Sequence, residues 1–77
     1  MPRTLEEVHR DADSSALRGL VSVLHEKLKL RARYALLEYE AGVDGHVEWS
    51  ELYRSLSRSE SEQIERLSAA LTVELQP

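Results

Sequence analysis

The segment ALRGLVSVLHEKLKLRARYALLEYEA, residues 16–41, carries the strongest structural pattern in this chain. One set of its apolar residues recurs at intervals of three and four, which is the spacing of a single helical face. That set comprises Leu17, Leu20, Val21, Leu24, Leu28, Ala32, Ala35 and Tyr39. A second set also repeats at helical spacing, and it comprises Val23, Leu30, Tyr34 and Leu37. The pattern predicts a long helix, over about residues 15–41, that is covered on more than one side.

The length of this helix constrains the shape of the molecule. A helix of about 26 residues is about 39 Å long, whereas a compact globule of 77 residues is roughly 30 Å across. The helix must therefore kink, for which Gly19 is the natural place, or belong to an elongated hairpin. An elongated hairpin exposes an apolar flank, and we expect a second copy of the chain to cover it.

On the N-terminal side of the long helix, the sequence predicts a short separate helix over about residues 4–12. Thr4 and Glu7 have the spacing of a capping box, which marks a helix start. The run Asp13-Ser14-Ser15 then favours an interruption, because these side chains compete for backbone hydrogen bonds and prefer helix caps.

On the C-terminal side, we expect a loop over about residues 42–47 and then one or two helices over about 48–75. Gly42 stands where a left-handed helix cap is expected. Two apolar sets at helical spacing follow, namely Trp49, Leu52, Tyr53 and Leu56, and then Ile64, Leu67, Leu71 and Leu75. Residues 57–60 are either a break between two helices or a soft point within one.

These elements predict an all-α fold in a single domain, residues 1–77. It is a helical hairpin with a short extra N-terminal helix, and two copies are expected to form a dimeric four-helix bundle. The chain has 77 residues and no cysteine, so neither a large core nor a disulfide stabilises it. Oligomerisation is the remaining ordinary source of burial.

Composition narrows the classes of function. The net charge of −4 is uneven, because residues 1–39 hold seven Lys/Arg and six Asp/Glu while residues 40–77 hold three and eight. The acidic half disfavours nucleic acid and suits a basic partner, a cation or solubility. No stretch has the apolar length of a signal peptide or a membrane span. We therefore expect a cytoplasmic protein with no membrane partner.

The stretch YEAGVDGHVEWSEL, residues 39–52, resembles the calcium-binding loop of an EF-hand. The resemblance implies that Glu40 opens the loop, Asp44 ligates, Gly45 forms the bend and Glu51 closes the loop. It further implies a backbone ligand at His46, an apolar contact at Val47 and a water-mediated ligand at Glu48. Calcium is the cofactor that this resemblance implies, through Glu40, Asp44, Glu48 and Glu51.

The sequence also departs from the EF-hand pattern. Glu40 is longer than the usual Asp, Gly42 offers no side chain at a ligand position, and no second loop is present. The alternative is a plain joint in which Gly42 ends a helix and Asp44-Gly45 forms a turn. On that reading the protein needs no cofactor.

Three further features of the sequence bear on function. KLKLRAR, residues 27–33, is basic, but alternate residues of a helix point about 200° apart, so its charges form no single stripe. A nucleic-acid site needs one continuous basic face from Arg10, Arg18, Lys27 and Arg31, and we expect no such partner. The three histidines lack zinc-ligand spacing. No nucleophile elbow or Ser/His/acid set is present, so we expect no enzyme and no catalytic residues.

The function predicted from sequence is therefore a small non-enzymatic interaction module that regulates or assembles a larger protein. This size and chemistry is shared by small antidote proteins, anti-activators and secretion chaperones, an analogy of class only. Nine residues are expected at the self-interface or partner interface: Leu17, Leu20, Leu24, Leu28, Leu30, Tyr34, Leu37, Trp49 and Tyr53. Trp49 and Tyr53 either contact a partner or close the hairpin's own core. The alternatives are a cation-responsive switch and a nucleic-acid-binding dimer.

Overall fold

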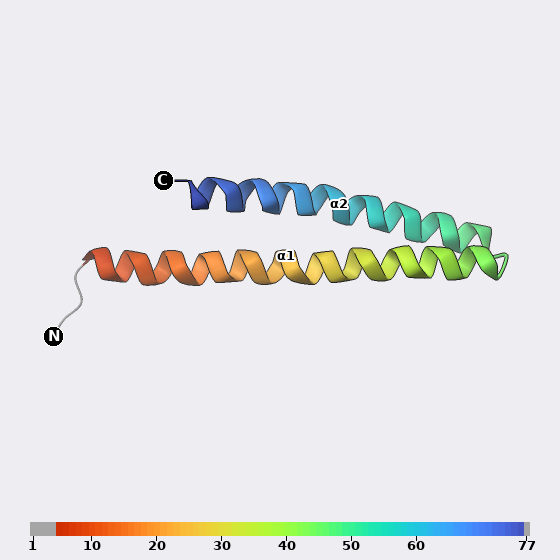
Figure 1. Ribbon diagram of the computed structural model, residues 1–77, viewed down its shortest axis with the longest axis horizontal. Coiled ribbons are helices and arrows are strands. Elements are labelled where there is room, and N and C mark those ends of the chain that lie inside the picture. Colours follow the sequence, from red (N-terminus) through yellow and green to blue (C-terminus); the bar gives the residue numbers. More distant parts are fainter. Residues whose placement is uncertain (1–4, 77) are drawn as a thin grey trace.

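The computed structural model describes the backbone of residues 5–76 and the side chains of residues 15–76. Two helices occupy this range, α1 (Leu5–Val43) and α2 (Val47–Leu75). They pack against each other as a hairpin, with Leu5 and Leu75 at the end opposite the turn (Figure 1). The predicted all-α helical hairpin is confirmed.

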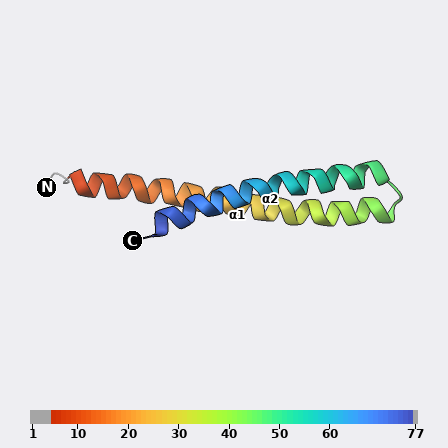
Figure 2. The same ribbon diagram turned by 90° about the horizontal axis from the view of Figure 1, so that it is seen from above.

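The hairpin is elongated, which is one of the two alternatives that the length of the predicted helix left open. Its extents are 65 × 22 × 13 Å and its radius of gyration is 18.4 Å, against about 11.5 Å for a compact chain of this length. Helix α1 passes Gly19 without a kink, and the two helices cross in projection, so that they wind slightly about each other (Figures 1 and 2).

The expected boundaries need two corrections. No separate short helix is seen over residues 5–12, because α1 continues unbroken through Asp13-Ser14-Ser15. These residues cost only a few tenths of a kcal/mol each in a helix, and neither Pro nor Gly is present to stop it. Thr4, the expected cap, lies outside the described residues. The turn covers residues 44–46 rather than 42–47. Of the two alternatives for residues 57–60, the structure has a single helix, because α2 passes through them without a break.

The turn is a Schellman motif centred on Gly45, not a cap at Gly42. The amide of His46 donates to the carbonyl of Ala41 at 2.8 Å. The amide of Gly45 donates to the carbonyl of Gly42 at 3.1 Å. This pair of bonds requires a left-handed residue just after the helix, and Gly45 has φ +79°. Gly42 itself remains helical. The next helix begins at once, because the amide of Ser50 donates to the carbonyl of His46 at 2.9 Å.

The helices meet along a line of alternating three- and four-residue steps, the spacing of a coiled coil. We call this line the hairpin seam, and every one of its side chains is buried or half-buried. On α1 it comprises Leu17, Leu20, Leu24, Lys27, Arg31, Tyr34, Glu38 and Ala41. On α2 it comprises Ser50, Tyr53, Ser57, Glu60, Ile64, Leu67 and Leu71.

The half of the seam next to the turn is polar or aromatic except at Ala41. Lys27 Nζ lies 3.2 Å from Glu60 Oε2, and both side chains are largely buried. Arg31 Nη1 donates to Ser61 Oγ at 3.2 Å. The rings of Tyr34 and Tyr53 stack with centroids 6.4 Å apart. Beyond Lys27 and Glu60, towards the open end, every seam residue is Leu or Ile.

These pairs also fix the register of the helices. Residue 27 lies opposite 60 and residue 34 opposite 53, so each step of seven along α1 is a step of seven back along α2. Continued to the open end, this register places Leu75 opposite about residue 12. The first turns of α1 therefore extend beyond the end of α2, as Figure 1 shows.

Candidate functional site

The hairpin exposes far more surface than its mass requires. Its accessible area is 6390 Å², whereas a compact monomer of 8.8 kDa exposes about 4,800 Å². Among the residues whose side chains are described, Ala41 and Ile64 are the buried hydrophobic ones. The excess of about 1,600 Å² thus accompanies a nearly absent core, and the outer faces of the helices are the place to look for a functional surface.

One face carries apolar residues from both helices, and we call it the apolar flank. Its members each precede a seam residue by one position: Val23, Leu30 and Leu37 on α1, and Trp49 and Leu56 on α2. In an antiparallel pair, these positions of the two helices lie on the same side. Two surface grooves support this placement. Leu37 and Trp49 line one of them, and Val23 and Gln63 line the other.

The flank is built in layers that widen towards the turn. The register places Val23 beside Gln63, Leu30 beside Leu56, and Leu37 beside Trp49. Trp49 is 55% exposed and Leu30 and Leu56 are each 36% exposed, so much of this apolar surface faces solvent. Leu52, which lies one turn from both Trp49 and Leu56, extends the flank on the outer side of α2.

The ring of Trp49 is held by the turn. The rings of His46 and Trp49 stack with their centroids 4.0 Å apart and nearly parallel. His46 is the residue at which α2 begins, and it makes no side-chain cap bond. The stack therefore fixes the edge of the flank nearest the turn without burying the indole.

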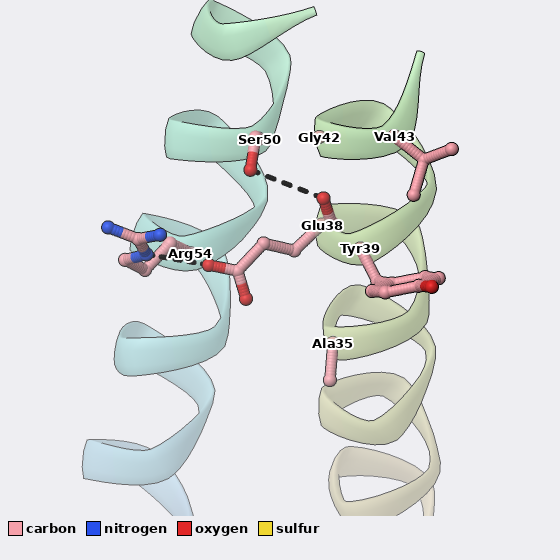
Figure 3. Close-up of a pocket in the computed structure, with 7 residues that line it drawn as sticks. All are labelled: Ala35, Glu38, Tyr39, Gly42, Val43, Ser50 and Arg54. Carbon is pink, nitrogen blue, oxygen red and sulfur yellow. Dashed lines mark hydrogen bonds and ion pairs between the residues drawn. The ribbon is translucent and has the colours of Figure 1, made fainter. Parts of the chain in front are cut away.

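A second apolar set lies near the turn on the side of α1 remote from α2, and we call it the outer stripe. It comprises Leu36, Tyr39 and Val43, at the three-and-four spacing of one helical face. Tyr39 and Val43 are 70% and 68% exposed, and Figure 3 shows both pointing away from α2. The apolar flank and the outer stripe therefore occupy different sides of α1.

A shallow groove between the helices near the turn is crossed by polar contacts (Figure 3). Arg54 Nε donates to Glu38 Oε1 at 2.6 Å, and Ser50 Oγ donates to the backbone carbonyl of Glu38 at 3.2 Å. The hydrogen bond to Glu38, and then its negative charge, raise the pKa of Arg54. These contacts tie α2 to α1 and leave the groove without a free charged group at its floor.

Eight of the nine predicted interface residues lie in the hairpin seam or in the apolar flank. Five are half-buried in the hairpin seam: Leu17, Leu20, Leu24, Tyr34 and Tyr53. Leu30, Leu37 and Trp49 belong to the apolar flank. Leu28 is 40% exposed on the opposite side of α1. Of the two aromatic candidates, Tyr53 closes the hairpin against Tyr34, and Trp49 faces outwards.

The acidic residues of the EF-hand resemblance are not gathered into one site. Residues 40–43 form the last turn of α1 and residues 47–51 lie in α2, so only three residues of the expected twelve-residue loop are non-helical. Within the described part of the chain, no three His, Asp or Glu side chains are grouped as a metal site requires. Glu40, Asp44, Glu48 and Glu51 are all exposed.

The basic residues do not share a face either. Lys27 and Arg31 point into the hairpin seam, where Glu60 and Ser61 engage them. Arg18 is exposed, and the side chain of Arg10 lies outside the described residues. A continuous basic face from these four residues would need Lys27 and Arg31 on the outside of α1.

The buried Glu60 and the flank residue Leu56 were missed as functional candidates. No charged residue was expected in the seam, although Lys27 and Glu60 occupy seam positions on their helices. The signal was available in the strict alternation of three and four along each helix, which identifies seam positions whatever residue fills them.

No helix among the described residues is both long and apolar enough to cross a membrane. Comparisons of the chain with protein families, with curated proteins and with solved structures found no match.

Proposed function

We propose that this protein is a non-enzymatic interaction module that dimerises through its apolar flank and binds a larger protein, which it regulates or assembles. The observation that carries the proposal is the apolar flank itself, an exposed surface shared by both helices, while only two hydrophobic side chains among those the structure describes are buried. Nothing in the described grooves offers an enclosed site for a small substrate.

The large accessible area of the hairpin supports a second copy as the occupant of the flank. A standard protein interface buries about 800 Å² on each partner, and this hairpin exposes about twice that amount beyond a compact monomer. Pairing two hairpins gives a four-helix bundle in which Leu30, Leu37 and Leu56 become core. The polar turn half of the seam also leaves the single hairpin short of buried apolar area.

The outer stripe suits the larger partner. Tyr39 and Val43 are exposed on the side of α1 away from the flank, and the acidic residues Glu40, Asp44 and Glu48 lie near them in sequence around the turn. A partner segment with apolar side chains and a basic rim complements this surface. Such a segment is the occupant we assign to it, with a basic amphipathic helix as the simplest example.

The first experiment is the solution mass by sedimentation. We expect twice 8.8 kDa for the wild type, both with calcium and with a chelator. Leu30→Glu should give a monomer, because a carboxylate on the flank would be buried without a partner. Ala32→Glu is the matched control, since it adds the same charge on the opposite, exposed side of α1. A wild-type monomer would overturn the dimer, and a calcium-dependent mass would favour the cation switch.

The second experiment tests the outer stripe with a defined probe. A fluorescent helical peptide of Leu and Lys should bind, and the same peptide with Glu in place of Lys should not. Tyr39→Ser should weaken binding of the Lys peptide about tenfold, while Leu75→Ser, an equally exposed site at the open end, should leave it unchanged. Equal binding of both peptides, or no effect of Tyr39→Ser, would contradict this assignment.

A further inference from the structure

We infer that the two hairpins of the dimer pack with their turns at opposite ends, so that α1 lies against α1 of the second copy and Leu30 sits on the two-fold axis. This inference rests on the proposed dimerisation through the apolar flank. It adds the orientation and the register of the assembly, which the exposed flank does not specify by itself.

Only two symmetric arrangements bring the flanks together. A two-fold axis along the hairpin places both turns at the same end and sets α1 over α2 of the second copy. A two-fold axis across the hairpin places the turns at opposite ends and sets each helix over its own counterpart. The layers of the flank, and the charged residues along its rim, fit one of these arrangements better than the other.

The layers favour opposite ends. With Leu30 and Leu56 at the axis, the wide layer of Leu37 and Trp49 faces the narrow layer of Val23 and Gln63, which keeps the distance between the hairpins even. The indole N–H of Trp49 then faces Gln63, whose amide nitrogen already donates to Ser59 Oγ at 3.2 Å and whose oxygen can accept. With the turns at the same end, the two wide layers meet each other and the hairpins splay.

The charges along the rim favour the same arrangement. Glu26 and Arg33 both follow a flank residue by three positions, so they border the flank on the outer side of α1, and both are exposed. They lie four residues before and three residues after Leu30. Across an axis at Leu30, Glu26 therefore faces Arg33 of the second copy, and symmetry makes this pair twice. Opposite charges at flanking positions of this kind set helix orientation in coiled coils.

The arrangement with both turns at the same end gives Glu26 and Arg33 no comparable ion pair. The hairpin register would then set the rim of α1 over the rim of α2 of the second copy. In that register Glu26 meets Ser59 and Arg33 meets Leu52, so neither charge finds an opposite charge. The rim therefore discriminates between two arrangements that bury the same flank.

The chain contains no cysteine, so single introduced cysteines report the arrangement directly. We expect Leu30→Cys to form a disulfide with itself under mild oxidation, because residues at the axis approach within the 4.4–6.8 Å between Cα atoms that a disulfide needs. Val23→Cys alone should not link, since its two copies would lie about 21 Å apart along the bundle. A mixture of Val23→Cys and Leu37→Cys chains should link to each other.

The outcomes separate the arrangement from the dimer. Linkage in a mixture of Leu30→Cys and Leu56→Cys chains, without self-linkage of Leu30→Cys, would put the turns at the same end and overturn this inference while leaving the dimer intact. A dimeric mass with none of these links would move the interface off the flank. A monomeric mass would overturn the proposed dimer itself.

Charge reversal supplies an independent readout. Glu26→Arg or Arg33→Glu alone should raise the dimer dissociation constant about tenfold, because each change turns two attractive pairs into repulsive ones. The double variant should return it to near the wild-type value. Lys29 lies one turn from both residues, so the series is repeated in a Lys29→Gln background. Additive losses in the double variant would overturn the pairing of Glu26 with Arg33.

Discussion

The two halves of the hairpin seam are built from different chemistry. Next to the turn, Lys27 meets Glu60 and Tyr34 stacks on Tyr53, with Arg31 and Ser57 at the seam positions between them. Towards the open end, leucines and Ile64 fill every position. Polar contacts are directional, so the turn half fixes the register of the helices. Apolar contacts are not directional but contribute most of the burial, so the open half supplies most of the stability.

This division explains why the flank is needed. A buried ion pair adds little net stability over an apolar pair of the same size, because both charges lose their hydration. The turn half is therefore well specified but weakly stabilised, and the flank beside it carries exposed large apolar side chains, Trp49 and Leu56 among them. A second copy would add apolar burial where the seam has least.

The largest loss of stability should follow truncation in the open half. Ile64 is 7% exposed, and Ile64→Ala removes buried methylene groups that the neighbouring leucines cannot replace. We expect a loss of about 2–3 kcal/mol, measured by urea unfolding at a fixed protein concentration. Ser57→Ala, a seam position in the turn half, is the matched control and should change little. Equal losses of stability at the two sites would contradict the difference between the two halves of the seam.

The next largest effect should come from the ion pair. Glu60→Ala leaves the Lys27 ammonium in the seam without a partner, and we expect a loss of about 1–2 kcal/mol. This is below the cost of a fully buried pair, because the Lys27 side chain is still 24% exposed and can reach water.

The double variant Lys27→Leu with Glu60→Leu tests the same ion pair. It should be at least as stable as the wild type, because two apolar side chains replace two desolvated charges. Urea unfolding measures the stability, and the helix register is checked by cross-linking cysteines placed at residues 34 and 53. A double variant less stable than Glu60→Ala would contradict the division of roles.

Two glycines should respond in opposite directions. Gly45→Ala forces a Cβ into the left-handed region and should cost about 1 kcal/mol. Gly19→Ala lies within a helix with open space around it and should stabilise the chain by up to about 1 kcal/mol. Thermal unfolding followed by circular dichroism measures both changes. A stabilising Gly45→Ala would contradict the Schellman turn.

The smallest effect should come from Arg54→Gln. This removes the exposed contact with Glu38, so the change should be slight and should vanish at high salt. The raised pKa of Arg54 means that its stabilisation is present at every pH below the ordinary arginine value and is lost only above the raised value. Thermal unfolding at several neutral pH values should therefore show no pH dependence from this pair.

The sequence was sufficient for the helical hairpin, which follows from apolar periodicity, and helix length narrowed its shape to a kinked helix or an elongated hairpin. It was insufficient for the boundaries at Asp13–Ser15 and Gly42, where local preferences of up to about 1 kcal/mol per residue are overridden by the continuing helix. It also gave Lys27 no position in the seam and assigned Tyr34 to a self-interface or partner interface. Periodicity locates a seam, but hydrophobicity alone does not tell which of two apolar faces the partner helix covers.

The order of the two halves along the hairpin has a consequence for how the chain folds. Ser50 and Glu38 are 12 residues apart, whereas Lys27 and Glu60 are 33 apart, and the leucine layers of the open half close longer loops still. Each doubling of loop length costs about 0.6 kcal/mol of closure entropy, so the polar half next to the turn should form first. We expect changes near the turn to slow folding, and changes at Leu20 or Leu67 to speed unfolding instead.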